Sequence, residues 1–172
     1  MAFIKKFSIP LVCLVSILLF FSLTAAAQTK PEILTDDNLK RVVPTSFYFA
    51  GQSAETQVRN SAAAKIGENR HIIAGLVDTS GYSTEISGKY EGLFITDSAI
   101  KIGGKLLNTG AYGFGFSQNG KLNIFDLSSK QILSVKTIDD AEMKRPRPLQ
   151  MTSDEKGVRL YKGKTYVVIA AK

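Results

Sequence analysis

The sequence predicts an all-β protein, a single-domain β-sandwich or small β-barrel of about nine short, mostly antiparallel strands. Three observations lead to this prediction. From Pro44 to the C-terminus, short apolar runs alternate with glycine and asparagine turn residues. No long segment repeats apolar residues at the helical spacing of about 3.6. The length of 172 residues is usual for a single domain.

Residues 1–27 have the three parts of a secretory signal peptide. The segment has a lysine pair, Lys5-Lys6, near its start, continues with a mainly apolar stretch over 7–23, and ends with the small residues Ala25 and Ala27. We expect cleavage before Gln28 and a secreted or periplasmic mature protein. An uncleaved membrane anchor is the alternative, because the apolar stretch is only slightly shorter than the ~20 residues that span a bilayer.

Cys13, the single cysteine, lies within this segment, so the mature chain is expected to contain no thiol and no disulfide. The remaining 145 residues must then be stabilised by an apolar core. A chain of this length buries roughly two thirds of the surface that it exposes when unfolded. Loss of the lysine pair lowers the net charge from +7 to +5.

Residues 28–43 contain few apolar side chains and are predicted to form an N-terminal tether. Thr35-Asp36-Asp37 is typical of a helix start, so one helical turn is expected there. The all-β domain is then predicted to cover 44–172.

Residues 53–66 (SAETQVRNSAAAKI) fit two structures. The alanines, a leading serine and a following glycine favour a helix. Alternation instead places Val58, Ala62, Ala64 and Ile66 on one face of a strand. We predict the strand, which turns at 67–69 into the apolar run 71–77.

The other strands are separated by short turn sequences. Gly103-Gly104, Asn119-Gly120 and Lys162-Gly163 are the clearest turns. The strands are expected at 89–96, 99–102, 111–117, 121–127, 131–137, 158–161 and 165–170. An outer-membrane barrel is disfavoured, because its strands need about 9 to 11 residues each.

The segment 75–81 (GLVDTSG) resembles the catalytic turn of aspartic proteases, in which an Asp follows an apolar strand and precedes Thr-Gly or Ser-Gly. Here Ser80 separates Thr79 from Gly81. The tight turn that brings two Asp-bearing loops together is therefore absent from the sequence. We interpret Asp78 as the start of a turn that leaves a buried strand.

His71 is the only histidine, so any serine triad must use it. Asp78 lies seven residues further along, which in an extended strand is the opposite face and roughly 23 Å away. With one histidine and no cysteine in the mature chain, we expect no metal site. The glycine spacing near residue 113 does not match a dinucleotide fingerprint, so no cofactor is expected either.

The strand at 110–116 (GAYGFGF) has one bulky face and one bare face. Alternation puts its three aromatic residues on one face and Gly113 and Gly115 on the other. Either a neighbouring element packs closely against the bare face, or a ligand approaches the backbone there. Gly113 and Gly115 are therefore candidate ligand-binding residues.

The segment Lys144-Arg145-Pro146-Arg147-Pro148 is cationic, and its two prolines favour an extended conformation. It is either a solvated crossover between strands or an anion-binding segment. Export argues against nucleic acid as the partner, so an anionic glycan, a lipid head group or another envelope protein is expected. Lys144, Arg145 and Arg147 are therefore candidate binding residues.

The segment 104–112 (GKLLNTGAY) resembles a hairpin that recurs in uncharacterised secreted bacterial proteins with a β-sandwich fold. The matching residues are Gly104, Lys105, Leu107, Gly110 and Tyr112. Asn108-Thr109 replaces the Pro-Ala that is usual there. The resemblance implies an all-β envelope protein and assigns no catalytic residue.

Taken together, these features predict an exported, non-catalytic β-domain that acts as a binding or cell-envelope module. A small secreted hydrolase is the alternative, and it would need His71 or two carboxylates at the floor of a pocket. A purely structural surface protein is a third possibility, and it would need neither a pocket nor a charged segment.

Overall fold

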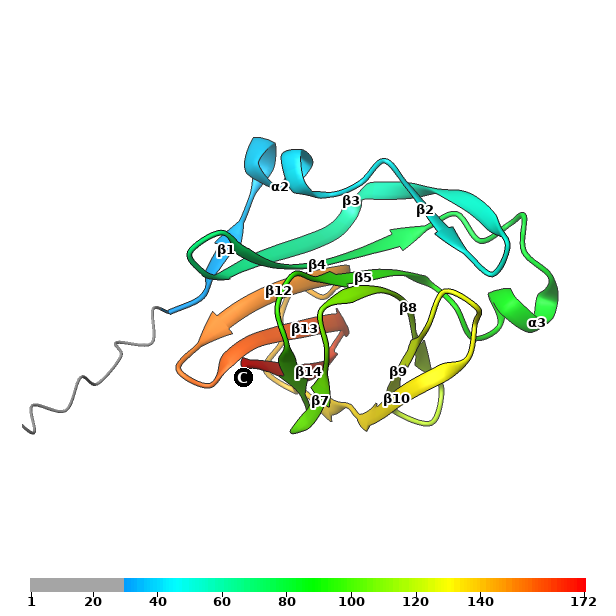
Figure 1. Ribbon diagram of the computed structural model, residues 1–172. Coiled ribbons are helices and arrows are strands. Elements are labelled where there is room, and N and C mark those ends of the chain that lie inside the picture. The colour runs from blue at the N-terminus through cyan, green and yellow to red at the C-terminus, as the bar shows by residue number, and fades with distance from the viewer. Residues whose placement is uncertain (1–29) are drawn as a thin grey trace, which may run out of the picture.

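Two antiparallel sheets lie face to face in the computed structural model, which describes residues 30–172 (Figure 1). The predicted signal peptide and Cys13 lie outside the described residues. The larger sheet has the order β1-β3-β4-β5-β8-β9-β10, and β2 pairs with the first part of β3. Its strands are β1 (Glu32–Leu34), β2 (Ser46–Phe49), β3 (Gln52–Gly67), β4 (Arg70–Val77), β5 (Gly92–Thr96), β8 (Gly110–Ser117), β9 (Lys121–Phe125) and β10 (Gln131–Lys136).

The smaller sheet has the order β12-β13-β14-β6-β7, and β11 pairs with β14. Its strands are β6 (Ile100–Ile102), β7 (Lys105–Leu107), β11 (Ile138–Asp139), β12 (Arg147–Asp154), β13 (Gly157–Gly163) and β14 (Thr165–Ala171). Over residues 30–172 the strands thus form two separate ladders, so the sandwich prediction is confirmed and the closed barrel is not formed.

The predicted strand at 53–66 is confirmed as part of β3. Its alanines are buried on both sides: Ala62 and Ala64 face the smaller sheet, and Ala63 faces the opposite side. Small side chains there let elements on both faces approach β3 closely. This packing outweighs the helical propensity of alanine, which is a weaker effect.

All nine predicted strands are present, and the described residues contain five more. These are β1, β2, β7, β11 and β12. β12 was missed because Pro148 cannot donate to a ladder. A register shift between Arg147 and Gln150 accommodates this proline.

The region predicted to be a tether is largely part of the domain. β1 pairs with β3, and the helix α2 (Asp36–Val42) follows Thr35, as expected for the helical turn. Ile33, Leu34 and Leu39 pack against the two cores. These few apolar residues are enough to bring the segment onto the sheet.

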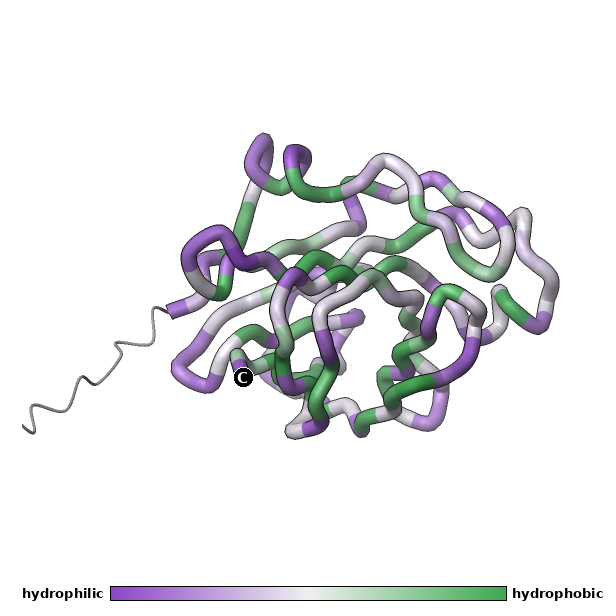
Figure 2. Tube along the Cα trace, in the orientation of Figure 1, coloured by the Kyte–Doolittle hydropathy of each residue, from purple (hydrophilic) through white to green (hydrophobic). Residues whose placement is uncertain are grey.

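The domain has one apolar core between the sheets and a second on the outer face of the larger sheet. In Figure 1, α2 and β2 lie over this outer face, and α3 (Thr84–Ser87) lies near its far end. Figure 2 shows apolar residues along the strands and polar residues at most turns. Neither helix of the described residues is long and apolar enough to cross a membrane.

Candidate binding surface

The bare face of β8 is filled by the protein itself. A β-carbon at Gly113 would meet the ring of Phe49, and one at Gly115 would meet the backbone carbonyl of Lys89. The aromatic face, including Phe114 and Phe116, points to the core between the sheets. Both glycines therefore allow close packing within the fold. Phe49 and the Lys89 backbone fill the space in which a ligand at Gly113 and Gly115 would have to lie.

The segment containing Lys144, Arg145 and Arg147, called the basic segment below, lies on the surface. All three side chains are exposed. The segment connects β11, which pairs with β14, to β12, which pairs with β13. It therefore passes the end of the β13–β14 hairpin.

Asp140 holds the start of this connection in place. Its backbone amide donates to the carbonyl of Lys164 (2.9 Å), and its carbonyl accepts from the amide of Met143 (3.3 Å). Its carboxylate accepts hydrogen bonds from the amide of Glu142 (3.1 Å) and the hydroxyl of Tyr161 (2.8 Å). Burial raises the pKa of Tyr161, so this hydroxyl keeps its proton. The backbone just before the basic segment is thus held in place by Asp140.

Tyr161 belongs to a polar network on the outer face of the smaller sheet. Arg159 lies over the ring of Tyr166 (4.9 Å) and forms an ion pair with Asp154 (2.6 Å). A hydrogen bond with Tyr161, and then the contacts with Asp154, raise the pKa of Arg159. Burial of Asp154 acts to raise the pKa of its carboxyl. Hydrogen bonds from the Lys156 amide and from Arg159 outweigh the effect of burial, so the pKa is lowered. Arg159 is therefore paired internally, unlike the basic segment.

Lys164 is a fourth cation at this surface, and the sequence analysis did not select it. The β13–β14 turn is Gly163-Lys164, one residue later than predicted, because Lys162 remains in the ladder opposite Thr165. Arg147 lies opposite Gly163, which brings the exposed Lys164 next to the basic segment. No local signal in the sequence indicates this proximity, because it depends on pairing between β12 and β13.

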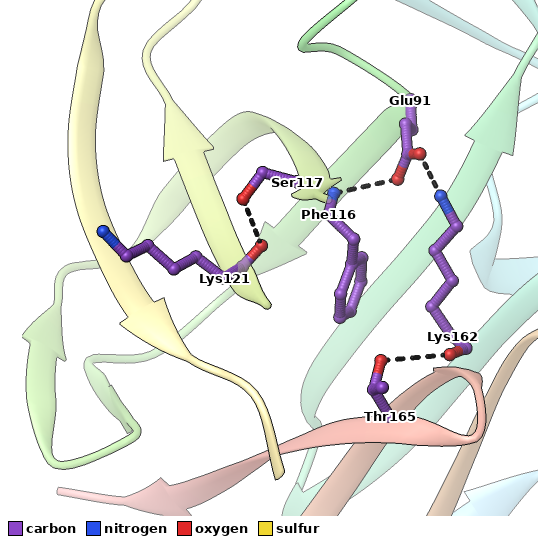
Figure 3. Close-up of polar contacts among 6 residues, drawn as sticks. All are labelled: Glu91, Phe116, Ser117, Lys121, Lys162 and Thr165. Carbon is purple, nitrogen blue, oxygen red and sulfur yellow. Dashed lines mark hydrogen bonds and ion pairs between the residues drawn. The ribbon is translucent and has the colours of Figure 1, made fainter. Parts of the chain in front are cut away.

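Lys162 faces the other way and joins the two sheets. Its ammonium group forms an ion pair with Glu91, whose second carboxylate oxygen accepts the backbone amide of Phe116 (2.9 Å) (Figure 3). The lysine also lies over the Phe116 ring (5.9 Å). Because this charge is already paired, Lys162 is not counted with the free cations of the surface.

Asp78 lies in the predicted turn after β4. Its carboxylate is exposed and accepts the amide of Ser80 (3.0 Å), while the amide of Tyr82 donates to Thr79 (3.1 Å). The hydrogen bond from the Ser80 amide lowers the pKa of Asp78. A catalytic pair of aspartates needs one carboxyl that holds its proton, so this environment has the opposite effect.

His71 lies beside Asp97, with 3.4 Å between its Nδ1 and the carboxylate. The same carboxylate oxygen accepts a hydrogen bond from the backbone amide of His71 (2.7 Å). Asp97 therefore contacts both the backbone and the ring of this histidine. Among residues 30–172 no group of three or more potential metal ligands gathers. His71 and Asp97 therefore form a local contact at the start of β4.

Two carboxylates do line a cavity of about 280 Å³, beside β1. They are Glu32 and Glu68, and the cavity is also lined by Lys30, Lys65 and Gly67. Both glutamates are exposed.

Comparison with protein-family models, with curated proteins and with solved structures gives no match for this chain. The arrangement of its residues is therefore the basis for proposing a function.

Proposed function

We propose that this protein is an exported, non-catalytic binding module of the cell envelope. Its ligand carries repeated sulfate, carboxylate or phosphate groups, and the basic segment together with Lys164 binds them. The single observation that carries the proposal is the grouping of four exposed cations from two separate elements. Within the described residues, none of the four forms an ion pair.

The fixed path of the segment supports this function. Binding of an anion by flexible side chains costs conformational entropy, and a backbone that is already held lowers part of that cost. Asp140 and the pairing of Arg147 with Gly163 hold the two ends. The attraction between exposed charges is screened over ~8 Å at physiological salt, so binding should be weak and should fall as salt rises.

Replacing Lys144, Arg145 and Arg147 together with serine is expected to abolish retention on heparin and on anionic lipid vesicles at low salt. The thermal midpoint should stay nearly unchanged, because substitutions of exposed side chains usually alter stability by less than ~0.5 kcal/mol. Retention is measured over a salt series, and the heparin and vesicle experiments separate the two sources of anionic groups.

A matched control replaces Lys101, Lys156 and Lys172 with serine. These lysines are exposed and lie at the other end of the smaller sheet, where Lys101 is opposite Ala170. This variant loses the same net charge and should retain binding. If both variants lose retention equally, the charge acts diffusely and the basic segment is only a solvated connection.

Export is tested on the natural product. If the chain is cleaved after Ala27, the intact mass of protein recovered from the periplasm or medium should correspond to a chain that begins at Gln28. A membrane-bound chain that still contains Cys13 would contradict this part of the proposal.

A further inference from the structure

A second group of cations, a pair of lysines, lies on the larger sheet. Lys121 in β9 and Lys136 in β10 are directly opposite each other in the ladder. Their neighbours Leu122 and Val135 point into the core between the sheets, so both lysines lie on the outer face. Like charges directly opposite each other destabilise a sheet. Among residues 30–172 neither lysine forms an ion pair with a carboxylate.

A short stretch of chain connects this lysine pair to Asp140, the residue that anchors the start of the basic segment. From Lys136 the chain leaves the larger sheet, and the amide of Thr137 donates to Gly120 (2.9 Å). It then enters the smaller sheet as β11 and reaches Asp140, which bonds to Lys164. Four residues of chain span at most about 13 Å at ~3.3 Å per residue. The backbone of Lys136 is therefore within about 13 Å of Asp140, whose amide bonds to Lys164 beside the basic segment.

We propose that the ligand is a linear anionic polysaccharide that contacts both groups at once. This inference rests on the proposed function and adds to it a second contact, at Lys121 and Lys136. A polymer bound at the basic segment presents its next charges to the lysine pair at a high effective concentration. The repulsion between the lysines is then relieved in the complex.

The acidic residues between the two groups favour a narrow chain over a membrane. Asp139 and Glu142 are both exposed. A flat anionic lipid surface would press against these carboxylates as well as the cations, and like charges repel. A linear chain can pass beside them and contact the cations alone.

The test compares a heparin disaccharide with a heparin octasaccharide by calorimetry at low salt, with affinities expressed per sulfate group. The octasaccharide should bind the natural mature protein at least about tenfold more tightly, because one chain can reach both groups. Lys121→Ser/Lys136→Ser should lose most of this length advantage while its affinity for the disaccharide changes by less than about twofold. Lys136→Glu, which can pair with Lys121, should have the same effect.

The control Lys101→Ser/Lys156→Ser removes two charges at the opposite end of the smaller sheet and should keep the length advantage. If the Lys121 and Lys136 variants also keep it, the second contact is wrong although the proposed function stands. If disaccharide binding survives loss of the basic segment, the proposed function itself is wrong. Tighter binding to phosphatidylglycerol vesicles than to the octasaccharide at equal charge would overturn the polysaccharide in favour of a membrane.

Discussion

Replacing Gly115 with valine is expected to destabilise the domain by about 3 kcal/mol, the upper part of the usual range for overpacking a core. The β-carbon would lie 3.0 Å from the carbonyl carbon of Lys89, and closer still to its oxygen. The obstacle is backbone, which cannot rotate away as a flexible side chain can. The backbone of Lys89 would therefore have to move. Two hydrogen bonds at Glu91 oppose this movement: its amide donates to the carbonyl of Phe114 (2.8 Å), and its carboxylate accepts from the amide of Phe116.

The measurement is the free energy of unfolding from denaturant titrations. Ala111→Val is the matched control, because Ala111 lies on the same face of the same strand and is exposed. It should change stability by less than ~0.5 kcal/mol. Equal stability of the Gly115 and Ala111 variants would show that the segment at Lys89 does not pack on β8 in solution.

Replacing Phe49 with alanine is expected to cost about 3 to 5 kcal/mol, as truncation of a buried phenylalanine usually does. Phe49 is fully buried, and its ring stacks on Tyr90 with 3.9 Å between centroids. It also occupies the space above Gly113. Among residues 30–172 β2 pairs only with β3, so its contact with the second core depends on Phe49 and its neighbour Phe47.

Tyr48→Ala is the control for this variant, since the neighbouring Tyr48 is 57% exposed. A double-mutant cycle with Gly113→Ala tests the contact directly. In the natural protein Gly113→Ala should be destabilising because the methyl group meets the Phe49 ring. In the Phe49→Ala background the same methyl group partly fills the cavity and should be tolerated. Simple additivity would contradict the contact.

Local sequence patterns were sufficient for nine of the strands and for the turns at Gly103-Gly104 and Asn119-Gly120. Gly103 and Gly104 both have positive φ values (54° and 81°), as the two-residue hairpin requires, and Gly120 has a φ of 69° in its turn. Alternation correctly separated the aromatic face of β8 from its glycine face. These features depend on a residue and its near neighbours along the chain.

The sequence alone therefore determined the fold class, most of the strands, their inward and outward faces, and the exposed basic segment. Tertiary structure decided what covers each face and which charges meet. The ring above Gly113 comes from a strand more than sixty residues earlier, and Glu91 pairs with a lysine 71 positions away. Lys164 joins the basic segment only through strand pairing. Alternation specifies the direction of a side chain, but the partner that it meets depends on long-range packing and strand register, which no local pattern encodes.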